Sequence, residues 1–190
     1  MCGRMNITDD PAVQWLWDYF NLSFQIKSNP DLCPTQQVPT IVWADDSLQQ
    51  RNSTWGIKPS WSKKPIINAQ GETVHSKKTF KTAFARQRCI IPCNGWYEWR
   101  DEGGARKQKY YFSHPDGLPF LMAGIWFEGE EQSQLVTLTT KPNKQCAEIH
   151  KRMPVLINPQ QVEAWFGLNA EDVRKMLIAI DGDDILIEKS

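Results

Sequence analysis

The second residue of the chain is a cysteine, in the opening stretch MCGRMN. Once Met1 is removed, Cys2 carries an α-amine and a thiol, whose ordinary pKa values of about 7.7–8.0 and about 8.5 leave both partly deprotonated near neutral pH. The amine can attack an aldehyde to form a Schiff base, and the thiol can then close on the same carbon to give a thiazolidine. Cys2 could instead attack an amide with its amine as base, or stand at this position by chance.

Three other residues have side chains that could hold or move protons. Glu98 lies among aromatic residues in GWYEW, and an apolar setting raises the pKa of a carboxyl group and makes it a useful general acid. His150, in EIHKRMP, titrates near neutral pH. Asn68 lies in INAQGET, which is also typical of a simple turn. Each of the three could equally be a side chain satisfied within the fold.

The charge of the chain is segregated although its net charge is zero. Residues 51–109 hold 13 Lys and Arg against 4 Asp and Glu, a net charge of +9, and the rest of the chain holds −9. The basic part also contains several of the nine tryptophans, including Trp61. Cations interleaved with aromatic rings suit single-stranded nucleic acid, because the rings stack on bases and the cations neutralise phosphates. A solvated basic face and tryptophans of the core are the alternative.

The composition predicts an intracellular protein. No apolar run is long enough for a membrane span, and the first residues lack a signal-peptide pattern. We therefore expect the five cysteines to be free thiols and the protein to be cytoplasmic, or associated with the nucleoid if it is bacterial. Cys89 and Cys93 have no second Cys or His pair beside them, so we expect no metal and no cofactor.

Short strands alternate irregularly with short helices along the chain. Asp9-Asp10-Pro11 is typical of a helix start, and the apolar residues that follow at helical spacing are expected to face the core: Val13, Leu16, Trp17 and Phe20. Asn158 and Asn169 are expected to open two more helices. Strands are expected within 88–99, 109–126 and 134–140 and in the tail, with residues 109–126 forming a hairpin that turns at 114–117. This mixture favours an α+β fold.

Six short motifs occur in an order that resembles the SRAP (SOS response-associated peptidase) family of abasic-site processing proteins. They are MCGR, WGIKPSW, INAQGETV, RCIIPCNGWYEW, MAGIW and IHKRMPVLI. The resemblance covers residues 2–166, and a C-terminal helix and tail follow over 169–190. It implies a single compact α+β domain over 1–190, with antiparallel barrel-like sheets flanked by short helices.

The resemblance also implies an activity and a set of site residues. Proteins of this family bind abasic sites in single-stranded DNA, and their N-terminal cysteine forms a thiazolidine with the opened sugar. Carried over, Cys2 is the crosslinking nucleophile, Asn68 orients the reacting groups, and Glu98 and His150 transfer protons. The implied DNA-binding residues are Arg4, Trp61, Lys81, Arg88 and Arg152. We expect a monomer that has lyase-type activity, and the family name also suggests self-removal of Met1.

The chain departs from the family pattern at two sites that concern DNA. Gln70 follows Asn68-Ala69 where an arginine is usual, and Lys81 stands where an arginine is common. The first change removes a phosphate-binding cation, and the second keeps the charge but loses the bidentate fork of arginine.

Two other functions are compatible with the residues. The first is an N-terminal-nucleophile hydrolase or peptidase that acts on an amide, which leaves the basic segment without a role. The second is a nucleic-acid binding module without catalytic activity. An adduct with abasic DNA that depends on Cys2 distinguishes the leading prediction from both.

Overall fold

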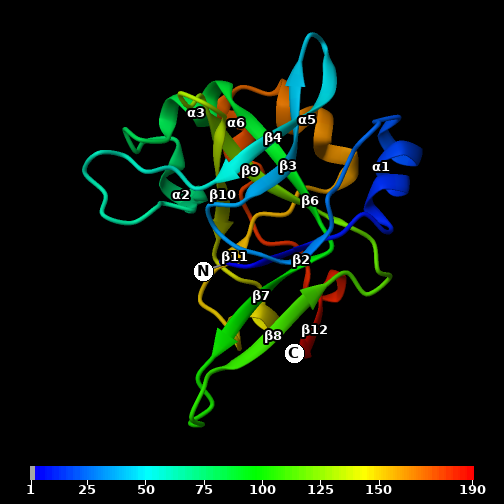
Figure 1. Ribbon diagram of the computed structural model, residues 1–190, viewed down its shortest axis with the longest axis vertical. Helices are drawn as coiled ribbons and strands as arrows, with labels where there is room; N and C mark the ends of the chain where they lie inside the picture. Colours follow the sequence, from blue (N-terminus) through cyan, green and yellow to red (C-terminus); the bar gives the residue numbers. More distant parts are fainter. Residues whose placement is uncertain (1–2) are drawn as a thin grey trace.

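The computed structural model describes residues 3–190, and its chain forms two sheets with short helices around them (Figure 1). The smaller sheet is antiparallel and has the order β12-β8-β7-β1-β2. Its strands are β1 (Met5–Ile7), β2 (Asn29–Leu32), β7 (Gly95–Arg100), β8 (Gln108–Ser113) and β12 (Leu186–Lys189). The predicted strand in the tail is therefore present and forms an edge of this sheet.

The larger sheet has the order β11-β10-β4-β3-β6-β9, and a further pairing of β9 with β10 closes part of it into a ring. Its strands are β3 (Gln37–Ala44), β4 (Ser47–Trp55), β5 (Asn68–Gln70), β6 (Arg88–Cys93), β9 (Phe120–Phe127), β10 (Gln134–Thr140) and β11 (Met153–Pro154). Strands β4 and β5 pair with β10 in parallel, and the other pairings are antiparallel. The predicted α+β class is confirmed, and the sheet that comes nearest to the predicted barrel-like form is this mostly antiparallel ring, which is not a barrel.

The helices are short. They are α1 (Ala12–Phe20), α2 (Gly71–Val74), α3 (Lys81–Arg86), α4 (Lys144–Ala147), α5 (Val162–Gly167) and α6 (Ala170–Val173), with 3-10 turns η1 (Pro159–Gln161), η2 (Arg174–Met176) and η3 (Gly182–Asp184). Asn158 and Asn169 cap the segments that they were predicted to open, since their side chains accept backbone N–H bonds. Within residues 3–190, no helix is long and apolar enough to cross a membrane.

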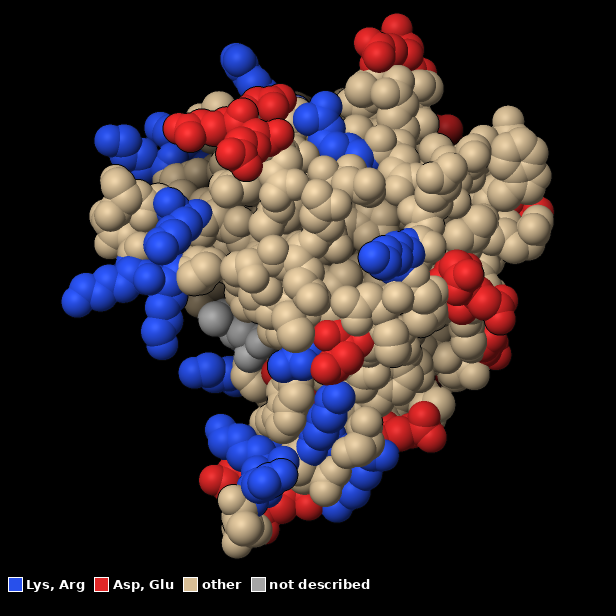
Figure 2. Space-filling model, in the orientation of Figure 1, with Lys and Arg blue, Asp and Glu red and all other residues tan. Residues whose placement is uncertain are grey.

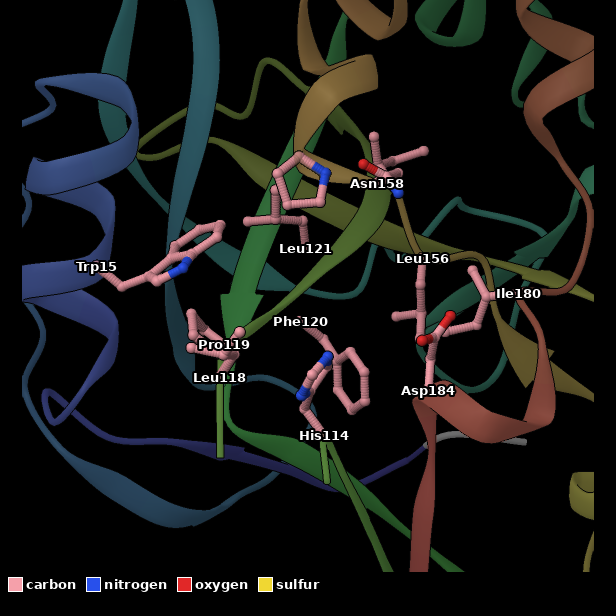
Figure 3. A pocket seen from close by; sticks show the side chains of 12 residues that line it. Trp15, His114, Leu118, Pro119, Phe120, Leu121, Leu156, Asn158, Ile180 and Asp184 are labelled. Atoms are coloured by element: carbon pink, nitrogen blue, oxygen red, sulfur yellow. The ribbon is translucent and has the colours of Figure 1, made fainter. Parts of the chain in front are cut away.

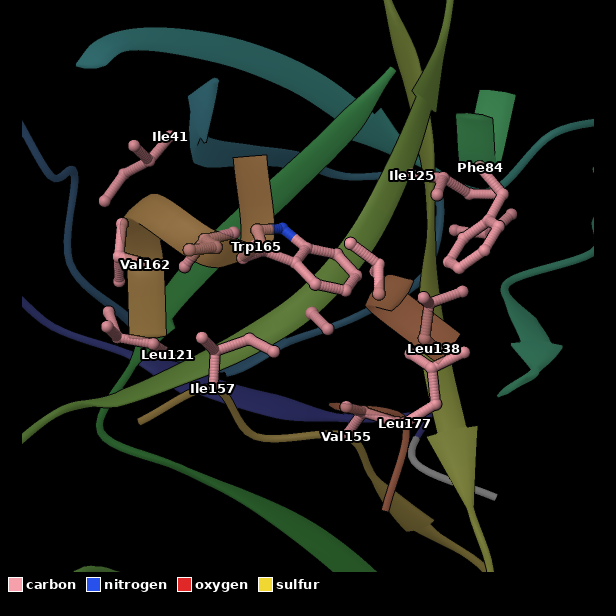
Figure 4. Close-up of a cluster of buried hydrophobic side chains, with 14 of the residues drawn as sticks. Ile41, Phe84, Leu121, Ile125, Leu138, Val155, Ile157, Val162, Trp165 and Leu177 are labelled. Atoms are coloured by element: carbon pink, nitrogen blue, oxygen red, sulfur yellow. The ribbon is translucent and has the colours of Figure 1, made fainter. Parts of the chain in front are cut away.

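Alternating side chains of the ring supply two buried clusters. In β6, Ile90 joins the first cluster, whereas Cys89 and Ile91 join the second, because successive side chains point to opposite faces of a strand. The first cluster surrounds Trp165 of α5 (Figure 4). The second lies between the ring and the smaller sheet, where Trp96 of β7 is fully buried. The second cluster therefore fixes the position of β7 against the ring.

Two local predictions are wrong. The turn at 114–117 is present, with the Gly117 N–H donating to the His114 carbonyl at 2.9 Å, but β8 and β9 do not pair as a hairpin. They enter different sheets, and Phe112 and Phe120 then both join the second buried cluster. In α1, Leu16 is buried as predicted, but Trp17 is about half exposed because the helix turns that edge to solvent.

Candidate functional site

The first described residues lie beside the strand that carries Glu98. Cys2 itself lies outside the described residues. The Arg4 carbonyl accepts a hydrogen bond of 3.0 Å from the Tyr97 N–H, and Met5 pairs with Trp96. Strand β1 therefore runs along β7, and the chain enters this part of the fold next to the Glu98 position.

Glu98 is buried and close to His150. Its Oε1 lies 3.8 Å from Nδ1 of His150, and the carboxylate side chain is only 4% exposed. Burial raises the pKa of Glu98 to about 7, because a low-dielectric environment disfavours the charged form. Burial also lowers the pKa of His150, because the low-dielectric environment disfavours the protonated, positively charged imidazole. At neutral pH the pair thus combines a partly protonated acid with a neutral imidazole.

The backbone of Arg152 orients His150. Its N–H lies 3.1 Å and its carbonyl 3.0 Å from the His150 Nδ1, so this nitrogen has a partner in either tautomer. The Arg152 guanidinium donates two bonds of 2.7 Å to the two carboxylate oxygens of Glu72, and a third of 2.6 Å to the Thr139 carbonyl. The loop after His150 is therefore tied to both α2 and β10.

Asn68 lies on β5 and is held against β10. Its Oδ1 accepts a hydrogen bond from the Thr137 hydroxyl, and β5 pairs in parallel with β10 from Asn68 opposite Thr137 to Gln70 opposite Thr139. Thr137 and Thr139 are two residues apart, so their side chains lie on one face of β10. Since Thr139 also contacts Arg152, the structure brings Asn68, His150 and Glu98 into one connected region.

Arg88 lies in the protein interior. Its guanidinium donates to five backbone carbonyls, which belong to Phe84, Ala85, Trp165, Phe166 and Leu168. These bonds use all five N–H donors of the side chain. The arginine that sequence reasoning placed among the DNA contacts therefore joins β6 to the ends of α3 and α5, and we assign it a structural role.

The other implied DNA-binding residues reach the surface to different degrees. Trp61 is 68% exposed and Lys81 is exposed at the start of α3. Arg4 is half-buried and forms an ion pair of 2.7 Å with Asp31. Figure 2 shows Lys and Arg gathered over α2, α3 and the loop before them, and again over the ends of β7 and β8. Exposed members of this basic surface are Lys58, Lys63, Lys64, Lys77, Lys78, Lys81, Arg86, Arg106, Lys107 and Lys151.

The sequence matches the family model described as SOS response associated peptidase (SRAP) over residues 1–188. The chain belongs to the SRAP family. The resemblance inferred from the ordered motifs is thereby confirmed.

Curated relatives of this SRAP protein are named for one process. The abasic site processing protein YedK of Escherichia coli is 31% identical over 80% of this chain and 70% of its own length. The abasic site processing protein YoqW of Bacillus subtilis is 28% identical over 97% of this chain and 90% of its own length. The rat abasic site processing protein HMCES is 25% identical over 67% of this chain and 48% of its own length.

Solved structures share the fold of this SRAP protein. A crystal structure of a protein from Bordetella bronchiseptica superposes with a TM-score of 0.86 at 23% identity, covering 100% of this chain and 99% of the other. A phage-related protein from the same organism gives a TM-score of 0.82 at 22% identity, covering 100% of this chain and 94% of the other.

Sequence reasoning missed two supporting residues of the candidate site. Thr137 fixes the amide of Asn68, and Glu72 fixes the guanidinium of Arg152. Glu72 lies within the INAQGETV motif and Thr137 within the strand QLVTLTT. Neither segment by itself identifies the distant residue that its side chain binds. Both pairs form only when β5, β10 and the loop after His150 come together.

The described cysteines differ in their access to solvent. Cys89, Cys93 and Cys146 are buried, and burial raises the pKa of Cys93 to about 12 and that of Cys146 to about 11. Cys33 is partly exposed. Within residues 3–190 no group of three or more His, Cys, Asp or Glu side chains is placed to hold a metal ion.

Proposed function

We propose that this SRAP protein processes abasic sites in single-stranded DNA by forming a covalent thiazolidine crosslink through Cys2 after Met1 has been removed. The crosslink would shield the abasic site during the response to DNA damage. Two lines of support come from the names of its curated relatives and from the acid–base pair beside the first strand.

The proposed reaction balances without a cofactor. The ring-opened abasic sugar presents an aldehyde, which the Cys2 amine attacks to give a carbinolamine. Loss of the carbinolamine oxygen as water leaves a Schiff base. The Cys2 thiol then adds to the same carbon, its sulfur forming the C–S bond and its proton passing to the nitrogen. The products are the thiazolidine and one water molecule, and no electrons are gained or lost.

The observation that carries the proposal is the distance of 3.8 Å between the buried Glu98 carboxylate and the His150 imidazole. Dehydration of the carbinolamine requires a proton donor, and a carboxyl group with a pKa of about 7 can supply it near neutral pH. A neutral His150 can accept protons from the opened sugar. Asn68, fixed by Thr137, would orient the reacting groups.

The basic surface supports binding of a single strand. Trp61 presents its ring to solvent among exposed lysines, and such a ring can stack on an unpaired base. Lys81 and its neighbours can neutralise phosphates. The Gln70 position of this chain contributes no cation, so we expect weaker salt dependence than an arginine there would give.

The proposal is tested by intact-mass measurement of the protein before and after incubation with single-stranded DNA that contains one abasic site. We expect loss of Met1 in the starting protein and a mass increase equal to the DNA minus one water. Cys2→Ala should abolish the stable adduct, whereas Cys33→Ala, which removes a partly exposed thiol elsewhere in the chain, should leave the yield unchanged.

Two additional arms make the test sharper. DNA with a tetrahydrofuran in place of the abasic sugar has no aldehyde and should give no adduct. Cys2→Ala keeps the amine, so borohydride should still trap a Schiff base with abasic DNA. An undiminished stable adduct in Cys2→Ala would refute the thiazolidine mechanism.

The second candidate is an N-terminal-nucleophile peptidase, which the word peptidase in the family description favours. In that function Cys2 would attack an amide and its own amine would accept the thiol proton. Turnover of peptide or glutamine substrates in the absence of DNA, lost in Cys2→Ala, would support it over crosslinking.

A further inference from the structure

Two adjoining hollows follow helix α1, on the side of the molecule away from α2 and α3 (Figure 1). The larger has a volume of about 830 Å³ and lies between α1, the β3–β4 turn and the segment from η1 to α5. The smaller, of about 150 Å³, is lined by Trp15, His114, Phe120 and Asp184 among others (Figure 3). Pro159 lines both hollows, and we refer to the two hollows together as the α1 groove.

Exposed aromatic rings border this groove. Tyr19 and Trp43, which line the larger hollow, are 48% and 49% exposed. Trp15 of the smaller hollow stacks on Tyr19 of the larger one, with ring centroids 5.2 Å apart. Exposing clustered apolar surface of this kind to water costs free energy, and such surface is typical of an interaction site. The aromatic rings also keep their positions by packing on one another, so little order would be lost when a partner binds.

The groove is acidic as well as aromatic. Asp18 and Glu163 line the larger hollow, Asp184 lines the smaller, and Asp45 and Asp46 follow Trp43 in the β3–β4 turn. Among residues 3–190, no Lys, Arg or His forms an ion pair with any of these five carboxylates, and no Lys or Arg lines either hollow. In Figure 2 acidic side chains lie at the top and along the α1 side, and a further acidic group lies at the upper left, whereas most Lys and Arg lie at the left and below.

We propose that this groove binds an extended basic segment of a partner protein. An apolar side chain of the segment would enter the smaller hollow against Trp15 and Phe120. Neighbouring arginine side chains would lie in the larger hollow over Trp43 or Tyr19 and pair with Asp18 and Glu163. A guanidinium group fits this combination better than an ammonium group, because it stacks on a ring and donates to a carboxylate at the same time.

The charge distribution argues against a second copy of the chain as the occupant. A symmetric pairing of two grooves would place their unpaired carboxylates against each other, which costs free energy. Docking of the groove on the basic surface of another copy is heterologous and would cover the surface that we assign to DNA. A basic segment of another protein avoids both conflicts.

The proposal is tested with a fluorescein-labelled peptide of four alternating Arg-Leu pairs and the full-length protein, followed by fluorescence anisotropy near physiological salt. We expect saturable binding with a micromolar Kd. Trp43→Ala and Glu163→Gln should each weaken binding about 5-fold or more. The corresponding peptide with Lys in place of Arg should bind more weakly, and the peptide with Glu should not bind.

Two matched variants control for general effects of charge and aromatic surface. Trp61→Ala removes an exposed tryptophan from the basic side, and Glu131→Gln removes one exposed negative charge away from the groove. Both should bind the peptide as the wild type does. Because no DNA is present, the outcome is independent of the proposed crosslinking activity.

Three results would overturn the proposal. The first is no saturable binding at 100 µM protein, and the second is equal weakening by the groove variants and their matched controls. The third is self-association of the wild-type chain in sedimentation that Trp43→Ala abolishes, which would assign the groove to a second copy.

Discussion

Arg152 binds Glu72 through two parallel hydrogen bonds of 2.7 Å, and its own backbone contacts the imidazole of His150. Such a bidentate pair fixes an arginine in angle as well as in distance. Glu72 on α2 therefore acts on the His150 ring through Arg152 without touching it. An arginine that the sequence suggests as a phosphate contact thus also has a positioning role within the protein.

Replacing Glu72 tests this positioning role. Glu72→Gln should lower the free energy of unfolding by about 1 kcal/mol, since Glu72 is partly exposed and Arg152 keeps its bond to Thr139. It should also slow formation of the proposed abasic-site adduct by about 10-fold, because a misplaced imidazole transfers protons poorly. Chemical denaturation and time-resolved gel analysis measure the two effects. Glu171→Gln, which breaks a surface ion pair with Arg174, should change neither measurably.

Glu98 makes stability depend on pH. Burial raises its pKa to about 7 from an ordinary value of 4.5, so between these pH values the folded protein holds a proton that the unfolded chain releases. The contribution of Glu98 to the free energy of unfolding should therefore decrease as the pH rises through this window, by at most about 3 kcal/mol.

Comparison with Glu98→Gln isolates this contribution. His150 titrates in both proteins, so the difference in unfolding free energy between them reports mainly on Glu98. Wild type should lose stability relative to Glu98→Gln as the pH rises from 4.5 to 7, as measured by urea denaturation at several pH values. A difference that stays constant over this range would contradict the raised pKa of Glu98.

Arg88 is predicted to matter for stability. Arg88→Met would leave five backbone carbonyls without their donor, and we expect a loss of about 3 kcal/mol or more. Arg86→Met, which changes an exposed arginine at the end of α3, should alter stability by about 0.5 kcal/mol or less. Protein that remains folded should bind DNA with unchanged salt dependence in the Arg88 variant. A smaller slope of log DNA affinity against log salt concentration in the Arg88 variant would show that Arg88 contacts DNA.

Trp61 and Lys81 are predicted to act on DNA affinity alone. Trp61→Ala should weaken binding of single-stranded DNA by about 1–3 kcal/mol through lost base stacking. Lys81→Ala should reduce the slope of log affinity against log salt by about 0.7. Fluorescence anisotropy with an abasic oligonucleotide at several salt concentrations measures both. Trp43→Ala, which removes a comparably exposed ring on the acidic side, serves as the control and should bind DNA normally.

The sequence by itself determined the local elements and the family. Asn158 and Asn169 could be recognised as caps because a cap bonds to N–H groups within three residues. Strand β10 could also be predicted, because a run of apolar residues is a local pattern that can be recognised without knowing its distant partners. The ordered motifs indicated the SRAP family, and with it the grouping of Asn68, Glu98 and His150.

Tertiary structure decided which of these residues meet and which face solvent. Residues 109–126 have the pattern of a hairpin, yet β8 and β9 enter different sheets, because Phe112 and Phe120 both become buried that way. The sequence predicted both Arg88 and Trp61 as DNA contacts. In the structure, however, Arg88 is enclosed by backbone carbonyls, whereas Trp61 is exposed. The contact of Glu98 with His150, the pairing of Arg152 with Glu72 and the groove along α1 depend on segments far apart in the chain. Contacts between distant segments are properties of the assembled fold, so no local pattern encodes them.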